Sequence, residues 1–436
     1  MKFRFYLSLI IARLAYFFLK ITKLSSGTAI IGLIALKICP DFLSYANEFI
    51  TNAKINITGT NGKTTTSGII SHLIKKENNS LINNSIGANM LNGIINTLAL
   101  EINPFKKAQF SVIETDEAFI TKIYEKMNGD YLLVTNLFED QTDRFATPLI
   151  TKDLIQKGIC LKKQVQLILN ANDPITASLT SAKEPIFYGI RNVKEEIKNI
   201  SSSSISNINC PLCGERLQYE KHFYSHIGNY NCKCGYRTPN IKYLADVTLY
   251  ENHSIINIAN EEFNVPLAGL YNAYNALGAI ALAKELNIKN IQENLKTFKT
   301  AFGRSEKRTL FGHETVLQLI KNPAGTNEVL KTIDLNSNIL IAINNNIADG
   351  TDISWIDQVN FEILSNTNKE IIVTGLCADS VADRLKKANV KNIKTISDIK
   401  KAVEYIGKNA NDKITILSSY TALLKINKSK EIKKCY

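Results

Sequence analysis

The stretch INITGTNGKTTTSG, residues 55–68, constrains the fold of this 436-residue chain more than any other feature of the sequence. An apolar run ends in a glycine-rich loop, and Lys-Thr then opens a segment with the pattern of a helix. Glycines allow backbone N–H groups to close around phosphate oxygens, and the helix N-terminus adds a partial positive charge. The stretch therefore predicts a strand, a phosphate-binding loop and a helix, in an α/β protein that binds a nucleotide.

Individual side chains of the loop have separate expected roles. Lys63 has the length to reach the β- and γ-phosphates of ATP, and the hydroxyl of Thr64 is suited to hold Mg²⁺. The general pattern has a glycine five residues before Gly62, where this chain has Ile57, so the loop is a shortened variant. The expected nucleotide contacts are Gly59, Thr60, Asn61, Gly62, Lys63, Thr64 and Thr65.

Short apolar runs alternate with helical patterns after residue 50, which is typical of parallel sheets that carry helices on both faces. A serine tract at 199–207 interrupts the alternation, and a second alternating set begins after residue 305. We therefore predict an N-terminal helical segment, a central P-loop ATPase domain, a zinc-ribbon insert within it, and a smaller C-terminal Rossmann-like α/β domain. Their expected bounds are 1–48, 49–304, 205–240 and 305–436.

Three acidic residues follow the next predicted strand, in the segment SVIETDEA. Ligands of open α/β sheets gather at the carboxyl ends of strands, and carboxylate oxygens suit Mg²⁺. The same acids would also serve as a solvated cap of the following helix. We favour the magnesium role for this cluster, which comprises Glu114, Asp116 and Glu117.

Four of the eight cysteines cluster in the insert as two close pairs separated by an 18-residue spacer. Four thiolates on two short turns are typical of a structural zinc ribbon with a closed tetrahedral shell. His222 or His226 is the alternative to one thiolate. Zinc is then expected to stabilise the insert and to take no part in the chemistry. The predicted ligands are Cys210, Cys213, Cys232 and Cys234.

The net charge of +12 is concentrated at the ends of the chain, because residues 1–50 and 423–436 contribute +4 each. Between Cys210 and Cys234 three basic residues face two acidic ones, a balance of +1. That is far from the basic footprint of a nucleic-acid-binding ribbon, so we expect no nucleic-acid partner. The scattered remaining cysteines indicate a reducing cytoplasm.

The first twenty residues, MKFRFYLSLIIARLAYFFLK, are mostly apolar, but their longest uncharged run is the eight residues Phe5–Ala12. A bilayer span needs about 20 apolar residues. We therefore expect an amphipathic helix with Arg4, Arg13 and Lys20 on its outer side. Its apolar face is either buried against the protein or laid on the membrane surface, so the expected location is cytoplasmic, with peripheral contact at the inner face of the cell membrane as the alternative.

Five motifs, GTNGKTT, ETDEA, TNLFEDQTDR, LNANDP and GLYNAYN, stand in the order found in Mur ligases and folylpolyglutamate synthases, and the chain resembles these enzymes over roughly residues 50–310. AFGRSEKR, KNPAGTNEVL and NNNIADGTDISWIDQVNFE resemble a narrower group, the MurT-type subunits of lipid II isoglutaminyl synthase. The resemblance implies that ATP phosphorylates a carboxylate and that a nitrogen nucleophile attacks the acyl phosphate. For the narrower group it implies amidation of the α-carboxyl of D-glutamate in the lipid II stem peptide to D-isoglutamine, in peptidoglycan synthesis.

The resemblance also implies roles for individual residues. Lys63 and Thr64 correspond to the phosphate and Mg²⁺ contacts, and Glu114 corresponds to the second Mg²⁺ ligand. Asn275 matches the position that recognises adenine. Arg304 resembles the arginine that meets the γ-phosphate, where its planar fork fits developing charge.

This chain departs from the family pattern in two motifs. The segment 140–143 reads DQTD where Mur ligases have Asp-His, and Asn172 stands where an aspartate is usual. Both departures put the geometry around the metal in doubt. Mur ligases also carry a domain before the loop that holds a uridine nucleotide, and the expected N-terminal segment is too short for one. We therefore expect a lipid-linked precursor, reached at the membrane surface.

The resemblance places the nitrogen source on another chain, a class I glutaminase of GatD type that forms a heterodimer with this one. Asp349 is implied to complete the Cys-His pair of that partner, and with Lys63 it makes up the expected catalytic set. The alternatives are that Asp349 only caps the turn before Gly350, or that Asp352 takes its role. Trp355 is expected either at this interface or in the core.

Two other functions fit parts of the sequence. A folylpolyglutamate synthase-like ligase would also begin near its phosphate loop, but it would act alone and would not need the ribbon. A zinc-ribbon nucleic-acid-binding ATPase would use the cysteine cluster and the net charge of +12. Turnover of folate and glutamate without a partner would favour the first, and binding to nucleic acid with a steep salt dependence would favour the second.

Overall fold

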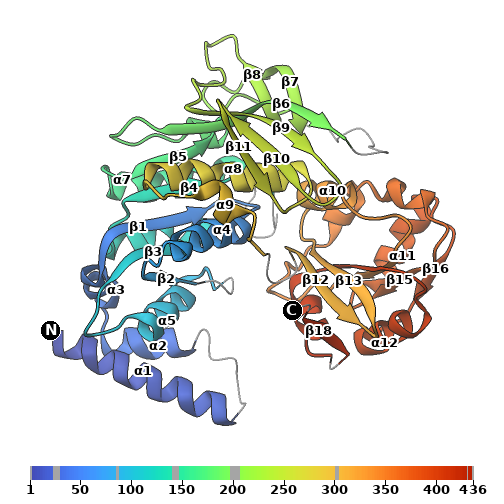
Figure 1. The fold of residues 1–436 in the computed structure, drawn as a ribbon, viewed down its shortest axis with the longest axis horizontal. Coiled ribbons are helices and arrows are strands. Elements are labelled where there is room, and N and C mark those ends of the chain that lie inside the picture. Colours follow the sequence, from blue (N-terminus) through green and yellow to red (C-terminus); the bar gives the residue numbers. More distant parts are fainter. Residues whose placement is uncertain are drawn as a thin grey trace.

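The computed structural model describes residues 2–22, 30–84, 88–139, 147–196, 207–299, 304–429 and 431–434. Two α/β units lie side by side, each built around its own sheet (Figure 1). The N-terminal helices lie at one end of the first unit, and the cysteine-bearing insert lies at its opposite end. The serine tract predicted as a linker falls almost entirely outside the described residues.

The first sheet has nine strands in the order β11-β10-β9-β6-β5-β4-β1-β3-β2. Four of the short apolar runs form β1, β3, β4 and β5, and these strands pair in parallel as expected. The runs are KINIT, QFSVIE, YLLVTN and VQLILN. The edge formed by β9, β10 and β11 is antiparallel within itself. The strands are β1 Ile50–Thr58, β2 Leu81–Asn83, β3 Ala108–Glu114, β4 Tyr131–Val134, β5 Gln166–Asn170, β6 Ile186–Glu195, β9 Tyr243–Leu249, β10 Ser254–Ile258 and β11 Glu261–Val265.

Helices cover both faces of this sheet, because β1 and its neighbours are apolar on both sides. Helices α4 and α8 pack on one face with the tip of the insert, and α5, α6 and α7 pack on the other. The segment LYNAYNALGAIALAKE is rich in alanine and forms α8, which is buried on nearly all sides. The helices are α4 Lys63–Lys76, α5 Leu91–Glu101, α6 Ile120–Lys126, α7 Pro148–Leu161, α8 Leu270–Glu285 and α9 Ile291–Leu295, with 3-10 turns η2 Glu117–Phe119 and η3 Thr176–Ser178.

The N-terminal segment consists of α1 Lys2–Thr22, α2 Ile30–Ile38, α3 Phe42–Ala46 and η1 Asn47–Phe49. One face of α1, with Phe5, Leu9 and Ala12, packs into the core shared with α2, α3 and α5. The prediction that Arg13 lies on the outer side is wrong, because its guanidinium donates hydrogen bonds to the carbonyls of Ala99 and neighbouring residues at the end of α5. Those carbonyls lack helical partners, and a cation is favourable there.

The opposite face of α1 is apolar and exposed, with side chains at the helical spacing of residues 3, 6, 10, 14, 17 and 21. Phe3 is 75% exposed, and Phe17 and Ile21 are each 64% exposed. Ile30 and Leu33 of α2 are also exposed. Among the described residues, α1 is the one helix whose length and hydropathy would by themselves allow it to cross a membrane.

The second unit has a seven-stranded sheet in the order β16-β15-β14-β17-β13-β12-β18. The predicted parallel set is confirmed from β16 to β17, and a β12–β13 hairpin extends it. Helices cover both faces here too. The strands are β12 Arg304–Leu310, β13 His313–Leu319, β14 Asn338–Ala342, β15 Ile371–Thr374, β16 Ile393–Thr395, β17 Ile414–Ser418 and β18 Ile432–Lys434, and the helices are α10 Pro323–Leu330, α11 Ala378–Lys387, α12 Ile399–Asn409, α13 Tyr420–Ile426, η4 Ser354–Gln358 and η5 Phe361–Asn366.

The insert is a separate two-stranded sheet formed by β7 Gln218–Tyr224 and β8 Ile227–Asn231, with the four cysteines on either side of it in sequence. Its base has a small apolar cluster of its own that includes Cys210, Tyr230 and Cys232. Its tip belongs instead to the main core, through Phe223, Tyr224 and other side chains. The base and the tip of the insert thus belong to two different apolar clusters.

Candidate nucleotide site

The glycines of the phosphate loop are required by close packing. Gly59 has φ +121° and Gly62 has φ +86°, values that L side chains rarely adopt. A Cβ on Gly59 would lie 2.3 Å from Thr135 Oγ1, and one on Gly62 would lie 1.9 Å from Asn275 Oδ1. The loop therefore passes tightly between β4 and α8, and α4 begins directly after it.

Asn136, which follows β4, holds the phosphate loop through hydrogen bonds. Its carbonyl accepts a hydrogen bond from the N–H of Thr60 (2.8 Å), and its side-chain oxygen accepts one from the N–H of Asn61 (2.9 Å). Its amide also donates to the carbonyl of Asn61 (3.1 Å). We did not predict this role, although Asn136 lies in the TNLFED segment, because a single asparagine gives no periodic signal.

Lys63 lies buried at the start of α4. Its ammonium contacts the carboxylate of Glu117 at 2.9 Å and the carbonyl of Gly59. Burial would lower the pKa of Lys63, but Glu117, Asp116 and Glu114 outweigh burial and leave the pKa raised. Lys63 therefore stays charged beside the loop, as phosphate binding requires. Asp116 caps η2 by accepting from the N–H of Ala118.

Thr64 and Glu114, the two expected magnesium contacts, lie next to each other. The hydroxyl of Thr64 donates to Glu114 Oε2 at 2.9 Å, and Asn89 donates to Glu114 Oε1 at 3.1 Å. Asn84 exchanges two hydrogen bonds with the backbone of Glu114, which fixes the end of β3. A hydroxyl and a carboxylate oxygen facing each other are the hard donors that Mg²⁺ prefers, so these residues fit that ion.

A cleft of about 640 Å³, open to solvent, runs along the loop. Of the predicted contacts, Asn61, Gly62, Thr65 and Asn275 line it. The backbone of Asn275 also accepts from the hydroxyl of Thr66 at 3.3 Å, which ties α8 to α4. Cleft residues that we did not predict include Asn136, Phe138, Tyr224, Tyr271, Lys321 and Glu328.

The two α/β units meet at the loop through a pair of amides. Asn61 donates to Asn322 Oδ1 at 3.3 Å, and Asn322 donates back to Asn61 Oδ1 at 3.0 Å. Asn322 also caps α10 by accepting from the N–H of Gly325. Arg304 begins β12, opposite Gln318, but its side chain lies outside what the structure describes. The predicted γ-phosphate contact of Arg304 therefore stays a prediction.

Asp349 lines a second cavity, of about 470 Å³, together with Lys321 and Trp355. Lys321 also lines the nucleotide cleft, so the two cavities adjoin. The half-buried carboxylate of Asp349 accepts from the N–H of Thr421 (2.7 Å) and from its hydroxyl (2.5 Å). It thus secures the start of α13 rather than the turn before Gly350.

The structure also shows where Asp352 and Trp355 lie. Asp352 lines the same cavity, and its carboxylate accepts from the N–H and hydroxyl of Ser354. Trp355 packs against the core of the second unit and also lines the cavity, and its contact with a partner stays a prediction.

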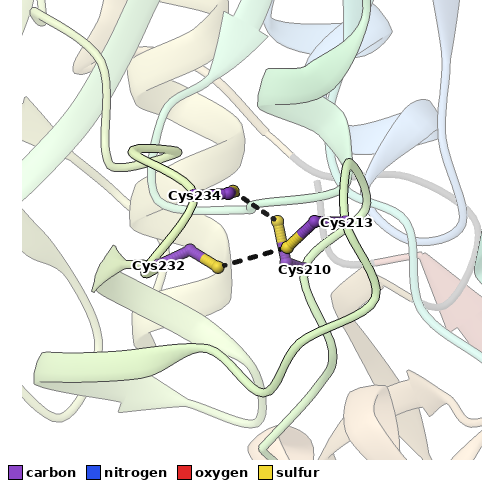
Figure 2. A group of neighbouring side chains, drawn as sticks. All are labelled: Cys210, Cys213, Cys232 and Cys234. Carbon is purple, nitrogen blue, oxygen red and sulfur yellow. Dashed lines mark hydrogen bonds between the residues drawn. The ribbon is translucent and has the colours of Figure 1, made fainter.

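The four cysteine sulfurs lie within 4.8 Å of one another (Figure 2). Within the described residues this metal-binding group contains the four cysteines and neither His222 nor His226. The set therefore fits the closed four-thiolate shell of structural zinc.

Of the two departures from the family pattern, the segment 140–143 lies outside the described residues. Asn172 is fully buried, and its side chain bonds to Ile190, Tyr274 and Asn229 of the insert. These contacts give the asparagine a structural role of its own.

Two family profiles match the chain, the Mur ligase middle domain at residues 57–233 and the MurT ligase C-terminal domain at 319–423. The MurT subunit of lipid II isoglutaminyl synthase (glutamine-hydrolyzing) from Staphylococcus aureus is 36% identical over 372 residues, 84% of each chain. The subunit of the same name from Streptococcus pneumoniae is 30% identical over 430 residues, 96% of this chain and 95% of its own.

Solved structures agree in fold. The pseudomurein peptide ligase type C from Methanothermus fervidus superposes with a TM-score of 0.65 at 24% identity, covering 86% of this chain and 79% of its own. The MurF ligase from Thermotoga maritima, solved with ADP, gives 0.62 at 14% identity, covering 90% and 83%. The fold and the phosphate-loop site define a ligase of the Mur type. Within that class, the similarity along nearly the whole length shows that the chain belongs to the MurT subunit family of lipid II isoglutaminyl synthases.

Proposed function

We propose that this chain uses ATP to activate the α-carboxyl of D-glutamate in the lipid II stem peptide, and that the acyl phosphate is then amidated to D-isoglutamine. The observation that carries the proposal is the convergence of Lys63, Thr64 and Glu114 at the start of α4, beside a cleft lined by Asn275. The names of the 36% and 30% identical relatives supply the substrate class.

The proposed reaction has two displacements. A carboxylate oxygen of the substrate attacks the γ-phosphorus of ATP, the bond to the bridging oxygen breaks, and ADP leaves. Ammonia then attacks the acyl carbon, the bond from that carbon to the phosphate oxygen breaks, and inorganic phosphate and a proton leave. Lys63 holds positive charge against the β- and γ-phosphates, and loop N–H groups orient them. Mg²⁺, held by Thr64 and Glu114, would neutralise charge on the phosphates.

Ammonia is proposed to come from a class I glutaminase subunit that docks over the Asp349 cavity. The cavity adjoins the nucleotide cleft, which keeps the path for ammonia short. Ile347 and Leu376, which follow β14 and β15, are 77% and 62% exposed near Asp349 and offer an apolar contact surface. A carboxylate that accepts the N–H of the partner's histidine would fix its tautomer and stabilise its charged form.

Reconstitution tests the proposed function. The chain is purified with a co-expressed class I glutaminase and supplied with Mg-ATP, lipid II, and either glutamine or ammonium chloride. We expect ADP and amidated lipid II in equal amounts from either nitrogen source, measured by a coupled ADP assay and mass spectrometry. If no ADP forms when lipid II is present, the proposal is wrong.

We also propose that α1 and α2 rest on the cytoplasmic membrane surface. The exposed apolar stripe of α1 supports this, as do the exposed cations Arg4, Lys20 and Lys37, which suit anionic headgroups. A transmembrane position would require Phe5 and Leu9 to leave the core and the bonds of Arg13 to break, so an interfacial position is favoured.

Vesicle sedimentation tests this location. The variant Leu14→Gln/Phe17→Gln/Ile21→Gln should lose most binding to vesicles that contain anionic lipid, while ADP formation with a soluble stem-peptide substrate is unchanged. The matched control, Phe105→Gln/Leu149→Gln/Leu212→Gln, removes three exposed apolar side chains elsewhere and should bind as the parent does. Equal binding of the two variants would contradict the proposal, as would self-association that the α1 variant abolishes.

A further inference from the structure

The hairpin of the cysteine insert reaches the nucleotide cleft. Tyr224, the last residue of β7, lines the same cleft as Asn61 and Asn275. It is buried, and the centroid of its ring lies 5.8 Å from that of Phe138 and 5.9 Å from that of Tyr274. A residue of the insert thus forms part of the wall against which a nucleotide would lie.

Polar contacts hold the hairpin tip against the central unit through Asn172. Its Oδ1 accepts from the N–H of Ile190 (2.7 Å) and from the hydroxyl of Tyr274 (3.0 Å). A backbone N–H can only donate, so this fixes the amide orientation and turns Nδ2 toward Asn229 Oδ1, 2.8 Å away in β8. The carbonyl of Asn172 also accepts from the N–H of Gly228 at 2.8 Å. The asparagine thus binds both the insert and α8.

A second connection runs from the tip through Asp173 to the phosphate loop. His226 Nε2 lies 3.3 Å from Asp173 Oδ1, and the His226 ring packs over Phe138 at 4.7 Å between centroids. Asp173 also accepts from the N–H of Leu137 at 2.7 Å. The next residue, Phe138, exchanges two hydrogen bonds with the hydroxyl of Thr60 in the loop. A short chain of contacts therefore connects the hairpin tip to the phosphate loop.

The cysteine cluster fixes the other end of the hairpin. Cys232 follows β8 directly, and it packs with Cys210, Leu217 and Tyr230 in a cluster separate from the main core. Such a small cluster buries little apolar area, so beside the hydrogen bond from the Tyr236 hydroxyl to the carbonyl of Pro174 a bound metal would be the main constraint on the base of the hairpin. Loss of the metal would loosen β7 and β8 between the base and the tip.

We propose that Tyr224 is a nucleotide-positioning residue and that the metal-bound ribbon keeps it in place, so that metal occupancy sets the affinity for a nucleoside triphosphate. This rests on the proposed function, because it takes the cleft to be the ATP site. Coupling between two sites is reciprocal, so bound nucleotide must also raise the affinity for the metal. The ribbon is then a support of the nucleotide site rather than a remote scaffold.

Calorimetric binding of a non-hydrolysable ATP analogue with Mg²⁺ tests the role of Tyr224 without reference to turnover. Tyr224→Ala should weaken binding about tenfold, the size of one lost aromatic contact, with one zinc still bound per chain. Tyr224→Phe, which keeps the ring, should bind within about twofold of the parent. Glu220→Ala, at an exposed position on the same strand, is the matched control and should leave affinity unchanged.

Removal of zinc with a chelator tests the coupling. We expect the stripped protein to bind the analogue more weakly, and saturating analogue to tighten zinc binding by the same factor, measured as the equilibrium release of zinc to a chromogenic chelator. If Tyr224→Ala does not fold, the zinc-release experiment on the parent protein still decides. Unchanged analogue affinity after zinc removal, with zinc release unaffected by the analogue, would overturn the inference. A protein that binds no analogue at all would contradict the proposed function instead.

Discussion

The nucleotide cleft and the Asp349 cavity share one local hydrogen-bond arrangement, but the exposure of the two carboxylates differs. In each, a carboxylate accepts a hydrogen bond from the threonine at the second position of a helix, Glu114 from Thr64 of α4 and Asp349 from Thr421 of α13. Glu114 is 3% exposed, whereas Asp349 is only half-buried.

The residues around the two carboxylates differ. Around Glu114, the buried Lys63–Glu117 pair and the amide of Asn89 come from the same unit, so that site is complete within the chain. Around Asp349, the neighbouring loops expose Ile347 and Leu376 to solvent. A buried cluster of charged side chains is typical of a catalytic site. A half-exposed carboxylate near apolar side chains suits a protein–protein interface.

The largest effect is expected for a substitution in the nucleotide cleft. Lys63→Ala should reduce ADP formation on the order of 10³–10⁵-fold with glutamine and with ammonium chloride alike, because it removes the cation that meets the transferred phosphate. Lys76→Ala, at the exposed end of the same helix, is the control and should retain full activity. ADP formation above about a tenth of the parent rate would show that Lys63 does not meet the transferred phosphate.

Asp349→Asn should impair the function of the Asp349 cavity and leave the nucleotide cleft intact. Glutamine-driven amidation is expected to fall on the order of 10³-fold, while the rate with ammonium chloride stays within about twofold. Asp352→Asn, in the same cavity, should keep both activities. Thermal unfolding of the Asp349 variant checks that α13 remains in place. Equal loss of both activities would assign Asp349 to the ligase site or to the fold instead of the partner.

The apolar loops beside Asp349 should contribute to affinity for the partner. Ile347→Lys/Leu376→Lys is expected to weaken the complex with the glutaminase about 10- to 100-fold, as charged residues are depleted from interface cores. Phe105→Lys, at a 97% exposed position on the other unit, controls for the added charge. Surface-immobilised glutaminase measures both dissociation constants. A complex of parental affinity would place the interface elsewhere.

The elements that the sequence predicts best are those with a local signal. The parallel strands, the phosphate loop and the cysteine pairs each occupy a short stretch whose spacing is set by backbone geometry. The contacts that complete the sites have no such signal. Asn61 and Asn322 are separated by 261 positions, and Asp349 and Thr421 by 72, so only the folded sheet brings each pair together.

Arg13 and Tyr224 show a second reason why sequence reasoning fails. The helical pattern placed Arg13 outside, but three carbonyls at the end of α5 provide acceptors that no pattern within α1 reveals. Tyr224 is one aromatic residue in an insert that we expect to take no part in the chemistry, and its place in the cleft depends on how the hairpin folds back. In both cases tertiary contacts decide.

The smallest expected effect concerns the amide pair that joins the two units at the loop. Asn322→Asp keeps the acceptor that caps α10 but loses the N–H donated to Asn61, and it places a negative charge near the phosphates. We expect KM for ATP to rise about 3- to 10-fold, the value of one hydrogen bond, with little change in glutaminase binding. Asn336→Asp adds the same charge at an exposed turn of the second unit and should not change KM. If Asn322→Asp weakened glutaminase binding as much as ATP binding, the two cavities would behave as one coupled site, and the distinction between a complete site and a shared one would fail.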